Sequence, residues 1–158
     1  MSKLKAAIAA ISVLSTPLAL SSPVQAHHSY TFVGKLNMFK GIRLNCTVTV
    51  VKTPSHTTPG TGTVTVNISA PDALCPALVV TSNPSTYDQS GSDLTINDVY
   101  VQTITAGDCE GDITGTKHYI GPGVDPALPG GGWVIDVDSF LPGGLGSPDC
   151  TVEGRLYS

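Results

Sequence analysis

The sequence predicts an all-β protein, an antiparallel β-sandwich of about eight strands with Gly/Pro-rich loops and two disulfides. Three observations support this prediction. Apolar and polar residues alternate with a period of two along several segments, 17 Gly and 12 Pro cluster largely between them, and no window of ten residues has the spacing of an amphipathic helix. Only 13% of the 158 residues are charged, against about 25% in a typical soluble domain, and strand-favouring Thr and Val are abundant.

The N-terminus has the pattern of an export signal. Two lysines precede an apolar stretch over Ala6–Leu20, and small residues around Ala26 form a cleavage site. We therefore expect residues 1–26 to be a signal peptide and residues 27–158 to be a single secreted β-sandwich domain. Its expected location is extracellular or at the cell surface, with the periplasm as the alternative.

Alternation is clearest over Ile42–Val51, Thr63–Ala70 and Cys150–Leu156, where one parity is apolar and the other polar. The other expected strands are, in chain order, Tyr30–Met38, Ala77–Thr81, Leu94–Thr105, Glu110–Thr116 and Trp133–Val137. Turn-rich loops separate them at 53–60, 121–132 and 142–148. The apolar parities predict a core of Leu44, Val48, Val50, Val64, Val66, Ile68, Val79, Ile96, Ile113, Ile135, Val152 and Leu156.

The four cysteines are Cys46, Cys75, Cys109 and Cys150, an even number that predicts two disulfides in an exported protein. Their gaps of 29, 34 and 41 residues differ from the closely spaced pairs of structural zinc sites. Four cysteines allow three connectivities, and all three stay open at this point. We prefer Cys46–Cys75 with Cys109–Cys150, because each loop then remains within one half of the chain.

Charge excludes one class of partner. After Ala26, six basic and twelve acidic side chains remain, a formal charge of −6, and they include no basic run. Nucleic-acid binding needs a surface that neutralises phosphates, so we expect none. No later segment has the length of a transmembrane helix, so we expect no membrane span in the mature chain.

The sequence contains no recognisable catalytic constellation, neither a Gly-x-Ser-x-Gly turn nor a phosphate-binding glycine loop. We expect no enzymatic activity, no catalytic residue, no favoured metal site and no cofactor. One alternative remains open, a copper-binding protein or copper oxygenase. Cleavage after Ala26 would expose the amine and imidazole of His27, and His56 or His118 would supply a second imidazole.

The cysteine-bearing segments resemble a known family. They are Gly41-Ile42-Arg43-Leu44-Asn45-Cys46, Leu74-Cys75-Pro76, the run Gly107–Gly115 around Cys109, and Pro148–Leu156 around Cys150. Their order is similar to that of exported bacterial activators of alkane oxidation of the PraB type, over roughly residues 34–158. The resemblance implies a small secreted β-protein that helps cells use hydrocarbons without oxidising them, and it carries over no site residue.

From these observations we expect a secreted, non-catalytic accessory protein that promotes hydrocarbon use at the cell surface or the oil–water interface. Its expected partners are hydrocarbon or cell-surface components. The alternative from another class is a fimbrial or biofilm-matrix fibre subunit that self-assembles by strand addition.

Overall fold

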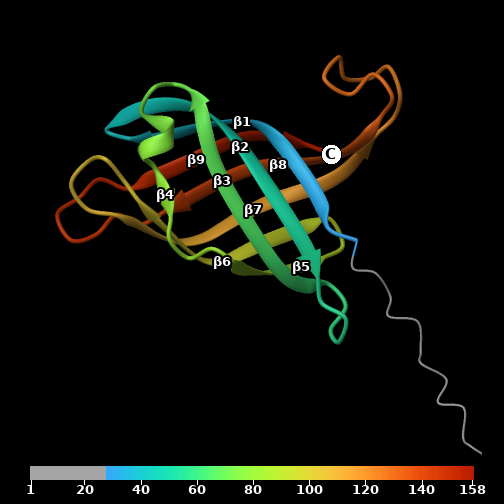
Figure 1. The fold of residues 1–158 in the computed structure, drawn as a ribbon, viewed down its shortest axis with the longest axis horizontal. Helices are drawn as coiled ribbons and strands as arrows, with labels where there is room; N and C mark the ends of the chain where they lie inside the picture. The colour runs from blue at the N-terminus through green and yellow to red at the C-terminus, as the bar shows by residue number, and fades with distance from the viewer. Residues whose placement is uncertain (1–27) are drawn as a thin grey trace, which may run out of the picture.

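The computed structural model describes residues 28–158, so the expected signal peptide and His27 lie outside the described residues. Within them the chain forms nine strands and one short 3₁₀ helix (Figure 1). The elements are β1 Tyr30–Lys40, β2 Ile42–Pro54, β3 Thr61–Pro71, η1 Cys75–Ala77, β4 Val79–Val80, β5 Ser85–Ser90, β6 Asp93–Gln102, β7 Cys109–Ile120, β8 Gly132–Leu141 and β9 Cys150–Tyr157.

Eight of these strands form a closed antiparallel barrel, and β4 is an extra strand beside β6. The barrel strands follow chain order, each paired with the next, and the first strand β1 pairs with the last strand β9 over Val33–Phe39 (Figure 1). The prediction of an all-β protein is confirmed, but the prediction of a sandwich is wrong. Alternation shows that one face of each strand is buried, and a sheet that curls onto itself buries that face as well as two stacked sheets do.

The strand predictions differ from the structure in the segment between β3 and β6. Ala77–Thr81 was expected to be a strand, but only Val79 and Val80 pair there. Val79 is 46% exposed, so its place in the expected core is wrong, and Val80 faces the interior instead. Strand β5 was missed because its sequence, STYDQS, has no apolar alternation and buries only a serine and a tyrosine.

Closure of the barrel requires close backbone contact between β1 and β9. A Cβ atom added at Gly34 would lie 2.0 Å from the carbonyl oxygen of Arg155, and one added at Gly154 would lie 2.5 Å from that of Lys35. Gly154 also has φ +146°, which L side chains rarely adopt. Glycine at these two positions therefore lets the first and last strands pair.

Two polar side chains replace ladder hydrogen bonds where neighbouring strands separate. β5 pairs with only the first part of β3, and beyond it the Asn83 amide accepts from the Val66 N–H at 2.8 Å and donates to its carbonyl at 2.7 Å. On the other side, Ser139 Oγ accepts from the Thr114 N–H at 2.7 Å and donates to its carbonyl at 3.0 Å. The backbone groups of Val66 and Thr114 thereby have hydrogen-bond partners without a continuous ladder.

The structure contains two disulfides, Cys46–Cys75 and Cys109–Cys150. The first disulfide links η1 to β2. The second joins β7 to β9 across the end of β8, which lies between them in the sheet. All four cysteines are buried, so both disulfides are part of the barrel interior.

One end of the barrel is filled by side chains. Phe32, Val64 and Tyr87 are at most 2% exposed there, and the ammonium of Lys52 lies 4.2 Å from the centre of the Tyr87 ring. Lys52 also donates to Gln89 Oε1. Burial, and then repulsion from Lys117, lowers the pKa of Lys52 to about 8. This end therefore contains a buried amine whose charged form is disfavoured.

Replacement of Gly34 by alanine tests the barrel closure. The added methyl group meets the Arg155 carbonyl only if β1 and β9 pair as they do here. We expect Gly34→Ala to lower the free energy of unfolding by about 1–3 kcal/mol, the usual range for overpacking. Gly121→Ala, where nothing lies within 4 Å of the added atom, is the control for urea denaturation. Equal stability of the two variants would contradict the closure.

Lys52 predicts a pH dependence of stability. Because its pKa falls from 10.5 to about 8 on folding, the unfolded chain binds more protons between these values, and stability rises with pH across that window. We expect wild-type protein to gain stability relative to Lys52→Met as the pH rises from about 8 to about 10.5. Urea denaturation at several pH values measures the difference, with Lys35→Met, an exposed site, as control. A difference independent of pH would refute the effect.

Candidate functional site

The interior of the barrel contains an apolar cavity of about 90 Å³. Its wall consists mainly of the inward-facing rows of the strands, among them Leu36, Leu44, Val48, Val50, Val66, Leu94, Ile96, Ile113, Ile135, Val137, Val152 and Leu156. An eight-stranded barrel is wide enough either to be filled by side chains or to hold one small ligand. The cavity places this barrel between these two cases, filled at the Lys52 end and hollow towards the other.

The size of the cavity limits what it accepts. A dry apolar cavity of about 150 Å³ holds a benzene molecule. The smaller cavity here fits a short stretch of an unbranched chain. Met38, which lines it, is only partly buried and has a flexible side chain, so the space can lengthen towards the surface.

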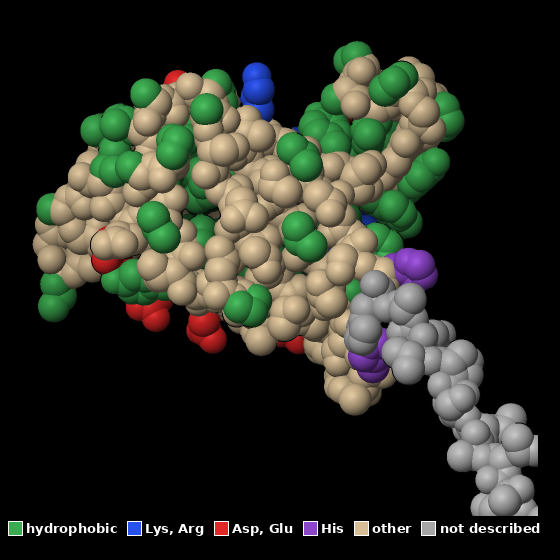
Figure 2. All heavy atoms as spheres, in the orientation of Figure 1, with side chains coloured by type: hydrophobic (Ala, Val, Ile, Leu, Met, Phe, Trp, Pro, Cys, Tyr) green, Lys and Arg blue, Asp and Glu red, His purple; other side chains and the backbone are tan. Residues whose placement is uncertain are grey.

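The cavity reaches the surface at the end of the barrel opposite Lys52. We call this opening the mouth; it is formed by the β1–β2 turn, the β6–β7 loop at 103–108 and the β8–β9 loop at 142–149 (left in Figure 1). Phe39, Ile42 and Ile104 belong to the cavity lining and are 40–48% exposed, and Leu145 is fully exposed on the neighbouring loop. Figure 2 shows hydrophobic side chains at this end of the molecule.

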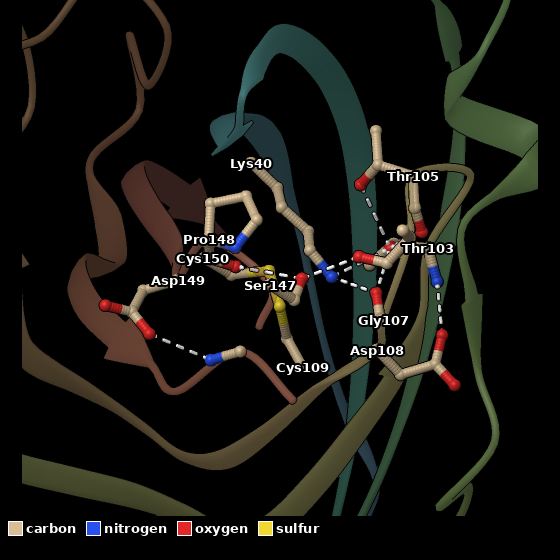
Figure 3. The surroundings of a disulfide bond; sticks show 12 residues. Lys40, Thr103, Thr105, Gly107, Asp108, Cys109, Ser147, Pro148, Asp149 and Cys150 are labelled. Atoms are coloured by element: carbon tan, nitrogen blue, oxygen red, sulfur yellow. Dashed lines mark hydrogen bonds between the residues drawn. A yellow bond between two sulfur atoms is a disulfide. The ribbon is translucent and has the colours of Figure 1, made fainter. Parts of the chain in front are cut away.

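Lys40 is the one charged residue of the cavity lining among residues 28–158. It ends the inward row of β1 that begins with Phe32, and it is 7% exposed. Its ammonium donates to the Thr103 hydroxyl at 3.2 Å and to the Gly107 carbonyl (Figure 3). No carboxylate lies within ion-pair distance of it in the described part of the chain.

The nearby carboxylate of Asp108 is engaged elsewhere. Its two oxygens accept hydrogen bonds from the Tyr100 hydroxyl at 2.5 Å and from the Thr103 N–H at 3.1 Å. These bonds, that of Tyr100 foremost, lower the pKa of Asp108, and the same hydroxyl bond raises the pKa of Tyr100. Asp108 therefore stabilises the 103–108 loop, and its charge interacts with that of Lys40 without a direct ion pair.

The loops around the mouth are joined to one another. Ser147 Oγ donates to the Ala106 carbonyl at 2.6 Å, and the Gly143 N–H donates to Asp149 at 2.9 Å (Figure 3). The disulfide Cys109–Cys150 anchors the bases of the same two loops. The mouth is thus a built opening with an apolar rim and a single buried cation, suited to binding an apolar chain.

The structure describes two of the three residues of the copper alternative, His56 and His118. His27 lies outside the described residues, and His56 is in the loop between β2 and β3. His118 is on β7, with Nδ1 3.6 Å from Asp136, a carboxylate that also accepts from Arg155 Nε at 2.6 Å. Among residues 28–158, no three His, Cys, Asp or Glu side chains are grouped to hold a metal ion.

The sequence analysis did not single out the mouth. The expected strand ended at Met38, and Lys40 was not among the candidate residues. One signal was present: Lys40 has the same parity as Phe32, Leu36 and Met38, so an extended strand places it inward. Thr103 and Gly107 carry no comparable signal, because loop residues have no parity.

The comparisons with known proteins identify a family but no characterised relative. No curated protein and no solved structure matches the chain. Among residues 28–158, no helix is both long enough and apolar enough to cross a membrane. The profile of the family described as "alkane oxidation protein activator PraA/PraB-like" matches residues 1–121, the portion that includes strands β1 to β7 and Lys40. The chain therefore belongs to the PraA/PraB-like family of alkane oxidation protein activators.

Proposed function

We propose that this protein is an exported, non-catalytic accessory protein that promotes alkane use by taking a hydrocarbon chain into its barrel. The observation that carries the proposal is the apolar cavity, which reaches the surface at the apolar mouth. Membership of an alkane oxidation activator family supports hydrocarbon as the ligand class. Each buried methylene contributes about 0.8 kcal/mol, so even a short enclosed stretch of chain binds measurably.

The site of action is the cell surface or the oil–water interface. Two buried disulfides are typical of proteins that fold in an oxidising compartment, and the N-terminal pattern of residues 1–26 supports export. The exposed side chains Phe39, Ile42 and Leu145 give the mouth an apolar surface for contact with oil.

A non-catalytic role agrees with the chemistry of the cavity. Apart from the cysteines, which are disulfide-bonded, Lys40 is the single titratable residue of the lining in the described chain. One buried amine without a paired acid or base does not form the constellations on which general acid–base or nucleophilic catalysis depends. The cavity can hold a chain, and its residues supply no group for oxidising one.

The fibre-subunit alternative receives less support. Strand addition needs an unpaired strand edge. Each of the eight barrel strands in residues 28–158 has a neighbour on both sides over at least part of its length, and the strand with a single neighbour, β4, has two residues.

Uptake of octane by the purified protein tests the proposed function. We expect the protein to deplete octane from the headspace of a sealed vial, and Val137→Phe to reduce this uptake about tenfold or more, because the ring occupies the cavity. Val124→Phe, on a residue that is 72% exposed, is the matched control. Gas chromatography measures the octane, and near-UV circular dichroism checks that each variant is folded.

A second variant distinguishes a filled cavity from a loss of folding as the cause of reduced octane uptake. Leu94→Ala enlarges the cavity rather than filling it, and we expect it to retain or increase octane uptake. Wild-type protein that removes no more octane than buffer would overturn the proposed function.

A further inference from the structure

The cavity is apolar along its length but has a charged end. Lys40 and Ile42 close the inward rows of β1 and β2 at the mouth, where they pair in register. Below them the wall is aliphatic, and above them lies the 103–108 loop. A ligand that follows the barrel axis therefore meets hydrocarbon surface in the interior and an ammonium group at the opening.

The ammonium of Lys40 has no direct ion pair among the described residues. An isolated buried ion is expensive, and such groups are normally paired with an opposite charge. Lys40 has only two neutral acceptors, Thr103 Oγ1 and the Gly107 carbonyl, while Asp108 is held by Tyr100 and Thr103. An ammonium group has three donors, so one N–H of Lys40 has no partner among the described residues.

A carboxylate is the group that fits this position. It brings one negative charge to one positive charge, and it accepts a charge-assisted hydrogen bond from the ammonium donor that has no partner. A neutral alcohol head would bring no opposite charge to Lys40. A dianionic phosphate would bring two negative charges to one ammonium, and repulsion from the nearby Asp108 carboxylate grows with the charge of the head group.

We propose that the preferred ligand of the barrel is an alkanoate, with its alkyl tail in the cavity and its carboxylate on the Lys40 ammonium. This inference rests on the proposed function, since it assumes that the barrel holds a hydrocarbon chain. The ligand class is thus an oxidised, anionic alkyl chain. Oxidation of the terminal methyl group of an alkane to a carboxylate is the class of reaction that supplies such a ligand.

Four eight-carbon compounds that share a heptyl tail distinguish the contribution of the head group from that of the chain: octane, octan-1-ol, octylamine and octanoate. We expect wild-type protein to bind octanoate about tenfold to a hundredfold more tightly than octan-1-ol, as charge-assisted hydrogen bonds imply, and octylamine most weakly. Lys40→Met replaces the ammonium by an uncharged side chain of similar length, and we expect this variant to lose the preference for octanoate while still binding octane. Lys35→Met, on the outward face of the same strand, should bind like wild type.

A second measurement needs no variant and covers the case in which Lys40→Met fails to fold. Octanoate labelled with ¹³C at the carboxyl carbon reports its own ionisation by NMR when bound to wild-type protein. A carboxylate beside the ammonium is stabilised in its charged form, so we expect the pKa of bound octanoate to lie below that of free octanoate. A pKa equal to or above the free value would overturn the placement at Lys40.

The outcomes distinguish this inference from the proposed function. If wild-type protein binds octane but prefers octan-1-ol to octanoate, the head-group site is wrong and hydrocarbon binding stands. If the preference for octanoate survives in Lys40→Met, another residue binds the carboxylate and the inference is wrong. If none of the eight-carbon compounds binds, both the inference and the proposed function fail.

Discussion

Pairing between the first and last strands is the constraint on which the remaining structure depends. β1 and β9 are separated by more than a hundred residues, and their pairing converts a meander into a closed barrel without a long unpaired edge. Gly34 and Gly154 allow it, because a Cβ atom at either position would overlap a carbonyl oxygen of the facing strand. Once the sheet is closed, every inward row faces the same axis, and these rows together enclose the cavity.

The two ends of the barrel differ although each receives an inward lysine. At one end Lys52 stacks on Tyr87 above a filled interior, and burial lowers its pKa to about 8. At the other end Lys40 lies over the cavity and contacts loop atoms that carry no formal charge. The difference arises from packing, since Phe32 and Tyr87 are buried in the interior at the first end, whereas Phe39 and Ile42 at the mouth remain partly exposed. A hollow end with a charged group is what makes the barrel suited to binding a ligand.

Much of the strand pattern could be predicted from alternation, and the failures have physical causes. Most predicted core residues line the barrel, whereas Val79 was wrongly placed in the core because a two-residue strand carries no period. Strand β5 was not predicted because its six residues are mostly polar, including those on its inward face. The cavity end of the site was unpredictable from local sequence, since Lys40 meets Thr103 and Gly107 across more than sixty residues of chain.

The sequence by itself determined an all-β chain, its main strands, their inward rows, and cysteines suited to two disulfides, and the family profile adds membership of the alkane oxidation activators. Only the tertiary structure decided that the sheet closes into a barrel, that its interior is hollow at one end, and that Lys40 lies at the opening. The physical reason is that a period of two reports which face of a strand is buried but not what buries it. Closure depends on non-local pairing, and a cavity depends on how side chains from eight strands fill the space between them.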